Sequence, residues 1–338
     1  MKRLPIILLS LVLAVILRAE KIGELPEIKN PHPMAVDKNE LFVVDEDYTI
    51  HVYSLKPVAP KFTFGKKGEG PEEFQYPPQI LILPDAIAVS DYMKTVWFSR
   101  EGKFVKAKPY SDFRDFDTNQ EMLLIPIKKN FVRVTVDHAA SQRTVVLLDS
   151  NFKPVRTLYV GLFDWKQVLL PHRIDVTCDK DRIFISDTRK GFFIRVIEAA
   201  GRDLTAIDKS GEVDKVPVKK DDQERIIEDI RLNEPDGVYA QATQSRFPEY
   251  YPLLHRFLVS DGKIYATTYK VQDGQHEMLI LDFKGNILKR MFLPLPSIRP
   301  FRRILRSDLF AVDRGKLFEL VKNPETEVWE LHQSVLLK

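Results

Sequence analysis

The segment FGKKGEGPEEFQYPP, residues Phe64–Pro78, decides how the fold of this chain is interpreted. It joins two short patterns that are typical of β-strands. Similar strand patterns recur several times along the 338 residues. Spaced glycines can also cradle a phosphate, but a phosphate loop requires a helix directly after it. Pro71, Pro77 and Pro78 exclude that helix. The glycines are therefore predicted to permit a tight crossing between two repeated units.

Each repeated unit begins with two short strands joined by a turn that carries Asn, Asp or Gly, residues that suit hairpin turns. Two further strands follow in most units, most clearly at Met278–Leu288, where a Lys-Gly-Asn turn separates them. We count six such units of about four strands, which is the composition of a propeller blade. The chain is therefore predicted to be all-β, a six-bladed β-propeller of four-stranded blades.

An aspartate follows the apolar triplet of the second strand in four units, at once or after one residue. These aspartates are Asp45, Asp91, Asp187 and Asp313. Carboxylate oxygens are ligands that calcium accepts. However, one aspartate per blade at a strand end would spread them around the ring, so capping of turns by the side-chain oxygen is the favoured interpretation.

The strand pair that ends in aspartate, together with the linker pattern G-x-x-G-x-G-P-x-x-F-x-x-P, resembles the NHL-repeat family of six-bladed propellers. The strand pattern covers Pro33–Asp313, whereas the full linker occurs once, at Gly65–Pro78. Tyr251-Pro252 and the following Asp261–Tyr265 are similar to bacterial exported propellers. Six-bladed propellers also include calcium-dependent lactonases and esterases, and the resemblance therefore implies such a hydrolase as the alternative function. That activity would require a compact cluster of Asp, Asn and Glu at one channel mouth.

The N-terminal residues 1–19 have the pattern of a signal peptide. Lys2 and Arg3 precede an apolar run over Leu4–Leu17, and the small residue Ala19 follows. The run is shorter than the ~20 apolar residues that span a bilayer, although an uncleaved anchor stays as the alternative and would be the only link to a membrane. An exported protein, periplasmic or extracellular, is expected. Residues 20–338 are expected to form one propeller, with Glu20–Ile28 adding a strand to the last blade because an open ring would leave unpaired strand edges.

The composition excludes several other classes of protein. Lys and Arg number 51 against 48 Asp and Glu, so the net charge is only +3, and with no long block of like charge no nucleic-acid partner is expected. The single cysteine, Cys178, excludes an internal disulfide, and no pattern around it indicates a nucleophile. The seven histidines show no ligand spacing for zinc. No metal, no cofactor and no catalytic residue are assigned.

One segment, residues 219–247, interrupts the repeat between blades four and five. Lys219–Leu232 places Ile226, Ile227 and Ile230 among charged residues, which predicts a short amphipathic helix. A loop is expected to follow as far as Phe247. Insertions of this length in compact domains are often functional, and this one could cap a face of the propeller.

The candidate binding site comes from aligning the starts of the six first strands, which surround the channel of a propeller. The aligned positions are Pro33, Gln79, Leu124, Arg173, Arg256 and Arg303, and the residues before them are His32, Pro78, Leu123, His172, His255 and Arg302. Arginine grips carboxylates and related anions with two parallel hydrogen bonds. The candidate ligand-binding residues are therefore His172, Arg173, His255, Arg256, Arg302 and Arg303.

The alternative is that these arginines pair with carboxylates such as Asp175 or Glu249 and hold the blades together. The function predicted from the sequence is an exported, non-catalytic binding module or interaction scaffold. Its partner is an unknown protein or an anionic small molecule or glycan.

Overall fold

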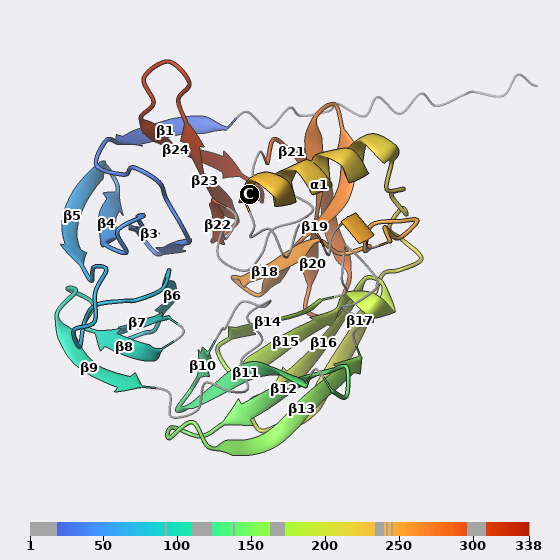
Figure 1. Cartoon of the computed structure of the whole chain (residues 1–338), viewed down its shortest axis with the longest axis horizontal. Helices are drawn as coiled ribbons and strands as arrows, with labels where there is room; N and C mark the ends of the chain where they lie inside the picture. The colour runs from blue at the N-terminus through green and yellow to red at the C-terminus, as the bar shows by residue number, and fades with distance from the viewer. Residues whose placement is uncertain are drawn as a thin grey trace, which may run out of the picture.

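The computed structural model of the chain describes residues 19–91, 93–109, 124–137, 139–162, 173–233, 240, 243–244, 246–295 and 309–337. In this part of the chain, six antiparallel sheets of four strands form a ring (Figure 1). The prediction of a six-bladed β-propeller is therefore confirmed.

Blades 1 to 5 each run from an inner strand to an outer strand in the order of the sequence. Blades 1 to 3 consist of β2–β5 (Met34–Asp37, Glu40–Val44, Ile50–Leu55, Val58–Phe64), β6–β9 (Gln79–Ile82, Ile87–Ser90, Lys94–Phe98, Phe104–Pro109) and β10–β13 (Ile125–Ile127, Asn130–Asp137, Gln142–Leu148, Pro154–Leu162). Blades 4 and 5 consist of β14–β17 (Ile174–Asp179, Arg182–Asp187, Phe193–Glu198, Asp203–Asp208) and β18–β21 (Arg256–Ser260, Lys263–Gln272, Gln275–Asp282, Ile287–Leu293). A 3₁₀ turn, Thr188–Lys190, lies between β15 and β16.

The sixth blade takes its strands from both ends of the chain. It is built from β22 (Phe310–Asp313), β23 (Lys316–Lys322) and β24 (Trp329–Val335), and β1 (Glu20–Leu25) is its outer strand. β1 pairs antiparallel with β24, from Glu20 opposite Gln333 to Leu25 opposite Trp329. The strand expected within Glu20–Ile28 therefore closes the ring as predicted.

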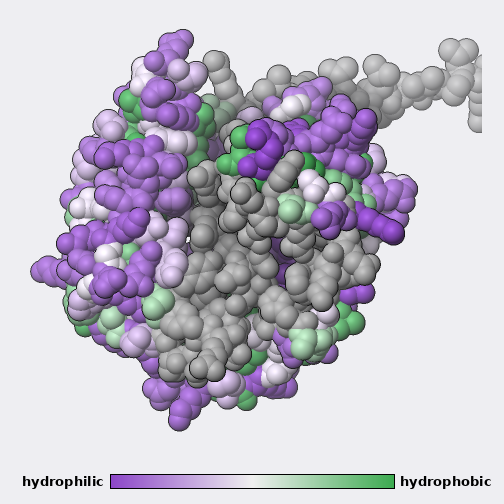
Figure 2. Space-filling model, viewed as in Figure 1, coloured by the Kyte–Doolittle hydropathy of each residue, from purple (hydrophilic) through white to green (hydrophobic). Residues whose placement is uncertain are grey.

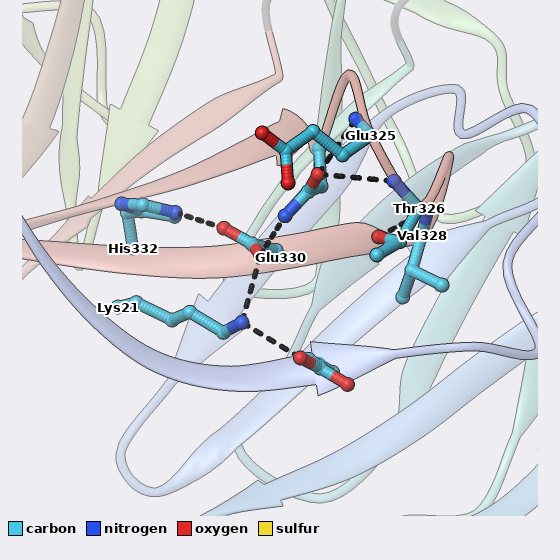
Figure 3. A network of polar contacts seen from close by, with 8 residues as sticks. Lys21, Glu325, Thr326, Val328, Glu330 and His332 are labelled. Carbon is cyan, nitrogen blue, oxygen red and sulfur yellow. Dashed lines mark hydrogen bonds and ion pairs between the residues drawn. The ribbon is translucent and has the colours of Figure 1, made fainter.

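A polar network reinforces this closure (Figure 3). The Lys21 ammonium lies 2.7 Å from a carboxylate oxygen of Glu330 on β24. Hydrogen bonds from Asn323, Lys21 and His332 lower the pKa of the Glu330 carboxyl to about 2. Because the carboxylate is ionised at any pH above that value, the contact between the two ends of the chain persists through mildly acidic conditions.

The two ends of the ring differ in their connections. The segments between blades lead into the inner strands at one end, which we call the linker face, and the hairpin turns of the inner strands lie at the other end, the turn face. The six inner turns are residues 38–39, 84–85, 128–129, 180–181, 261–262 and 314–315.

Apolar side chains pack between adjacent blades, because successive residues of a strand point to opposite faces of its sheet. Among the described residues, each of five junctions between blades holds nine to twelve buried hydrophobic residues. The junction between blades 2 and 3 holds only five, among them Trp97 and Phe131. This junction is therefore the most thinly packed in the described part of the ring.

The linker at Phe64–Pro78 fixes blade 1 against blade 2. Phe74 is completely buried in the hydrophobic cluster between the two blades. Gly65 has φ of 69°, and a Cβ there would lie 2.7 Å from Ile50, so only glycine suits the crossing. The Gly70 N–H donates to the Glu73 carboxylate at 2.9 Å. This hydrogen bond fixes the conformation of the linker. The glycines therefore permit the crossing from blade 1 to blade 2, as expected.

Two of the recurring aspartates hold the linker that enters their own blade. The buried carboxylate of Asp45 accepts the backbone N–H groups of Lys29 and Asn30, and that of Asp91 accepts the N–H of Gln75. Asp187 instead accepts the Tyr159 hydroxyl at 2.7 Å and the Arg189 N–H.

The assignment of Asp313 to this series is wrong. It ends the inner strand β22 and does not follow a second strand, because Phe310–Val312 pairs outward with β23. An apolar triplet followed by aspartate therefore occurs in two different places of the blade, and the triplet alone does not distinguish them.

The predicted helix is confirmed as α1, Lys220–Asn233, between blades 4 and 5. Ile226 and Ile230, four residues apart on one face, pack against Val218 and Tyr251. In Figure 1 the helix lies over blade 5, and hydrophilic side chains predominate on its visible side in Figure 2. None of the helices in the described part of the chain is long and apolar enough to cross a membrane.

We expect that Leu25→Ala weakens ring closure. Leu25 is completely buried at the junction of blades 6 and 1, and truncation of such a residue costs about 2–5 kcal/mol. Urea unfolding should show this decrease in the free energy of unfolding. Glu20 is exposed on the same strand, and Glu20→Ala should change stability little. Equal effects of the two substitutions would contradict closure through packing of β1.

Glu319 on β23 predicts a pH dependence of stability. Its side chain is buried, and desolvation raises the pKa of the carboxyl from 4.5 to about 7. The folded state therefore holds the proton more tightly than the unfolded state. The contribution of this carboxyl to the stability of the folded protein is complete below about pH 4.5. It is lost as the pH rises through 7, and the total loss is about 3 kcal/mol.

Glu319→Gln, which cannot ionise, should match the wild type at pH 4.5 and exceed its unfolding free energy at pH 8. The exposed Glu325→Gln on the same blade is the control. Urea unfolding of all three proteins at both pH values measures the effect. A Glu319→Gln variant with the same pH profile as the wild type would refute the elevated pKa.

Candidate functional site

Three of the six candidate residues lie in the described part of the chain. Arg173 directly precedes β14, His255 directly precedes β18, and Arg256 is the first residue of β18. His172, Arg302 and Arg303 lie outside the described residues. Because β14 and β18 are the inner strands of neighbouring blades, the described candidates gather on the linker face at the junction of blades 4 and 5.

Arg173 connects the two blades. Its guanidinium donates a hydrogen bond to the backbone carbonyl oxygen of His255. The same nitrogen, Nη2, lies 3.8 Å from Oδ2 of Asp175, so the ion pair considered as the alternative is present, although at long range. The Arg173 side chain is nevertheless 39% exposed. The side chain is thus positioned by protein contacts and is still partly exposed to solvent.

The backbone of Arg173 is also fixed. Its N–H donates to Oγ1 of Thr188 at 2.8 Å, and its carbonyl oxygen accepts the Thr188 N–H at 3.0 Å. Thr188 follows β15, the second strand of the same blade, and is buried. Both ends of the residue are therefore held, which reduces the conformational entropy that the side chain would lose when it binds a ligand.

The imidazole of His255 does not face the channel. The residue is only 4% exposed. Nδ1 lies 3.2 Å from Oγ1 of Thr267, and the ring packs edge-on against Tyr269, with 4.9 Å between the centroids. Tyr269 in turn stacks on Tyr251, which contacts α1. His255 therefore contributes its carbonyl oxygen to the site, and its side chain belongs to the packing of blade 5.

The two His-Arg pairs do not occupy the same register, contrary to the sequence alignment. Counted from the inner hairpin turn, Arg256 opposite Thr267 is equivalent to Asp175 opposite Ser186. Arg173 therefore lies two residues before the position of Arg256. The reason is that linker residues were aligned, whereas only the hairpin turn and the cross-strand pairs determine register.

The same correction applies to other blades. In blade 6 the equivalent of Arg256 is Leu309, six residues after Arg303, and in blade 3 Leu124 lies one residue closer to the inner turn than Arg256 does in blade 5. At this register, the described members from blades 4 and 5 are Asp175 and Arg256, which bring one negative and one positive charge to neighbouring inner strands.

Several contributors to the site were missed in the sequence. Thr188 directly follows the second strand β15 of blade 4, and Thr267 and Tyr269 lie on β19, the second strand of blade 5. No local signal could have identified Thr188 as a partner of Arg173, because the contact spans 15 residues and depends on strand pairing. The stacked Tyr251 and Tyr269 are likewise joined only by the docking of the linker on blade 5.

The chemistry available at this junction is that of binding an anion. A guanidinium carries five N–H donors and no acceptor, and it stays charged at any physiological pH. Cys178, on β14, is protonated at neutral pH because burial raises the pKa of its thiol. Within the described ranges, no three His, Cys, Asp or Glu side chains are grouped so that they could hold a metal ion.

No protein-family model and no curated protein matches the chain. The resemblance to NHL repeats therefore stays a prediction. Among solved structures, the chain is similar to a "putative exported protein" from Bacteroides fragilis, with a TM-score of 0.56, 12% identity and 95% of each chain covered. At this identity the similarity concerns the fold alone.

Two further similarities have lower TM-scores. A protein of unknown function from Bacteroides caccae gives 0.43, with 11% identity over 78% of this chain and 81% of that chain. BamB from Moraxella catarrhalis gives 0.39, with 12% identity over 89% of this chain and 84% of that chain. We draw no functional conclusion from either. The fold that the six sheets describe is that of a β-propeller, and the similarity to the Bacteroides fragilis protein extends over 95% of it.

Proposed function

We propose that the protein is an exported, non-catalytic β-propeller that binds an anionic ligand on its linker face, at the junction of blades 4 and 5. The single observation that carries this proposal is the position of Arg173. Its guanidinium is anchored to the His255 carbonyl across the junction, and 39% of the Arg173 side chain is still exposed. An exposed arginine whose conformation is already fixed loses little entropy when it grips an anion.

The neighbouring charges support the same function. Arg256 begins the adjacent inner strand, and a carboxylate, an acidic sugar or an acidic peptide could contact both arginines. Asp175 sets a limit on affinity, because its carboxylate would repel an anion and competes for Arg173. The ligand is therefore expected to carry more than one negative group, so that its attraction to two arginines exceeds this repulsion.

A non-catalytic role is supported by the surroundings of these arginines. The His255 imidazole is engaged by Thr267 and Tyr269, and the Cys178 thiol is protonated, so neither offers a base or a nucleophile to a ligand. We further infer that the repeats are of the NHL-like kind, from the strand pattern and the linker Gly65–Pro78. The helix α1 beside the site would extend the binding surface for a larger partner.

Export rests on the sequence of residues 1–19. Residues 1–25 fused to a bacterial phosphatase that is active only outside the cytoplasm are expected to confer phosphatase activity on whole cells. Replacing Lys2 and Arg3 by Glu should reduce that activity, because the positive start of a signal peptide would be lost. Activity that is absent in the first fusion would contradict the proposed export.

The ligand site is tested with citrate, a small anion with three carboxylates. Isothermal titration at low salt should detect binding to the wild type, and Arg173→Gln and Arg256→Gln should each weaken it by about tenfold, the effect of losing one hydrogen-bonded charge. Arg173→Lys keeps the charge and loses the planar fork, so its affinity for citrate should lie between that of the wild type and that of Arg173→Gln. Arg202→Gln is the control, because Arg202 is exposed on the same blade and pairs with Glu198.

Thermal melts of each variant separate binding from folding. A variant that melts at a lower temperature but binds citrate as the wild type does would support the alternative, in which the arginines only hold the blades together. A wild type that does not bind citrate, or variants that bind it equally well, would overturn the proposal.

A further inference from the structure

A cavity lies between blades 2 and 3, away from the arginines. Its volume is about 490 Å³, and its walls include Trp97, Lys106, Lys108, Lys128, Lys129 and Phe131, which together we call the lysine pocket. It is located at the junction with the thinnest described hydrophobic core. Cavities that bind small molecules typically measure about 300–1,000 Å³. The lysine pocket therefore has the size of a ligand site.

The strand pattern explains why the lysines converge. In blade 2, Trp97 pairs in register with Lys106, and Thr95 pairs with Lys108. Residues that alternate along a strand share one face of the sheet, so Lys106 and Lys108 lie with Trp97 on the face toward blade 3. Val96 and Phe98, on the other face, pack against blade 1. Alternation thus places two ammonium groups along one wall.

The opposite wall comes from turns of blade 3. Lys128 and Lys129 form the inner hairpin turn, and Ser150 belongs to the turn between the two outer strands. Lys128 has φ of 53°, a conformation in which a turn more often uses Gly or Asn. Four lysines from two blades therefore surround one cavity at the turn face.

Three of these lysines form no short ion pair within the described residues, although Lys108 interacts at longer range with the Asp149 carboxylate. The Lys106 ammonium lies 4.9 Å from the centroid of Trp97, and that of Lys108 lies 4.1 Å from the centroid of Phe152 and donates to the Ser150 carbonyl. Among the residues that the structure describes, no carboxylate is within 4 Å of the ammonium of Lys106, Lys108 or Lys129. Lys128 lies 4.0 Å from Asp181, and both side chains are mostly exposed. Such a pair contributes little.

The lining of the pocket has no acidic residue. Four ammonium groups around one cavity produce a positive potential that attracts anions and repels cations. Trp97, Phe131 and Leu83 supply an apolar wall beside them. A ligand that fits both features has an apolar or aromatic body and at least one strongly acidic group.

We propose that the lysine pocket binds a small organic anion, an aromatic or apolar body that carries a phosphate, sulfate or carboxylate group. The acidic group lies among the ammonium groups of Lys106, Lys108 and Lys129, and the body lies against Trp97 and Phe131. This site is independent of the arginines of blades 4 and 5. It is located at a different junction and on the opposite face of the ring.

The test uses 1-naphthyl phosphate, titrated into the full-length protein at low salt by calorimetry. The wild type should bind it, and should bind inorganic phosphate and 1-naphthol more weakly, because each has only half of the recognised features. Affinity should fall as salt is added, since the attraction is between exposed charges. Lys106→Gln and Lys129→Gln should each weaken binding by about tenfold.

Two controls make the result specific. Lys284→Gln removes an exposed lysine from an outer turn of blade 5 on the same face and should leave the affinity unchanged. Lys106→Arg and Lys129→Arg keep the charge and should retain most of the affinity. Thermal melts of every variant should match the wild type, because the replaced side chains are exposed.

Several results would overturn the proposal. The first is that the wild type does not bind 1-naphthyl phosphate. The second is that the Lys106→Gln and Lys129→Gln variants bind it as tightly as Lys284→Gln does. The third is that 1-naphthol and 1-naphthyl phosphate bind equally well. Loss of binding in Arg173→Gln, with binding retained in Lys106→Gln, would assign the anion to the arginines instead. Binding of acidic peptides alone would show a protein surface rather than a small-molecule site.

Discussion

The pairing of β1 with β24 is the constraint on which the rest of this ring depends. A blade is apolar on both faces, and only its two neighbours can cover them, so an open arrangement would leave two apolar faces and an unpaired strand edge in water. Leu25 and Ile28 complete the core between blades 6 and 1, and Lys21 reaches Glu330 on the neighbouring strand. The chain's two ends are thereby made parts of one sheet.

Within the closed ring, the described hydrophobic cores of the junctions are unequal, and the two proposed sites lie at the junctions with the smallest and the largest of them. Where the core is thick, side chains from linkers fill the space, as Phe74 does between blades 1 and 2. Where blades 2 and 3 meet, fewer apolar side chains are buried among the described residues, and a cavity lined by lysines opens at the turn face. Between blades 4 and 5, Arg173 crosses the junction on the linker face. Positive charge is thus offered at two separated places on a protein whose net charge is only +3.

Much of the fold could be predicted from local signals, because hairpins and amphipathic helices depend on residues that are close in sequence. The turn residues and apolar triplets indicated the blades, the polar and apolar spacing around Ile226 and Ile230 indicated α1, and the strand within Glu20–Ile28 was expected on topological grounds. The site was less predictable. The alignment of Arg173 with Arg256 was wrong because it counted through linkers of different length, and Asp313 was placed in the wrong strand for lack of cross-strand pairs.

The sequence by itself determined that this protein is a closed ring of repeated four-strand units, since alternation and turn chemistry act within a few residues. Only the tertiary structure decided which charges become neighbours. The imidazole of His255 turned into the packing of blade 5, and its carbonyl oxygen became the partner of a residue 82 positions away. Lys106 and Lys129 share a cavity because the facing walls of blades 2 and 3 leave a space between them. Such contacts depend on how complete faces fit together, and no local pattern of residues carries that information.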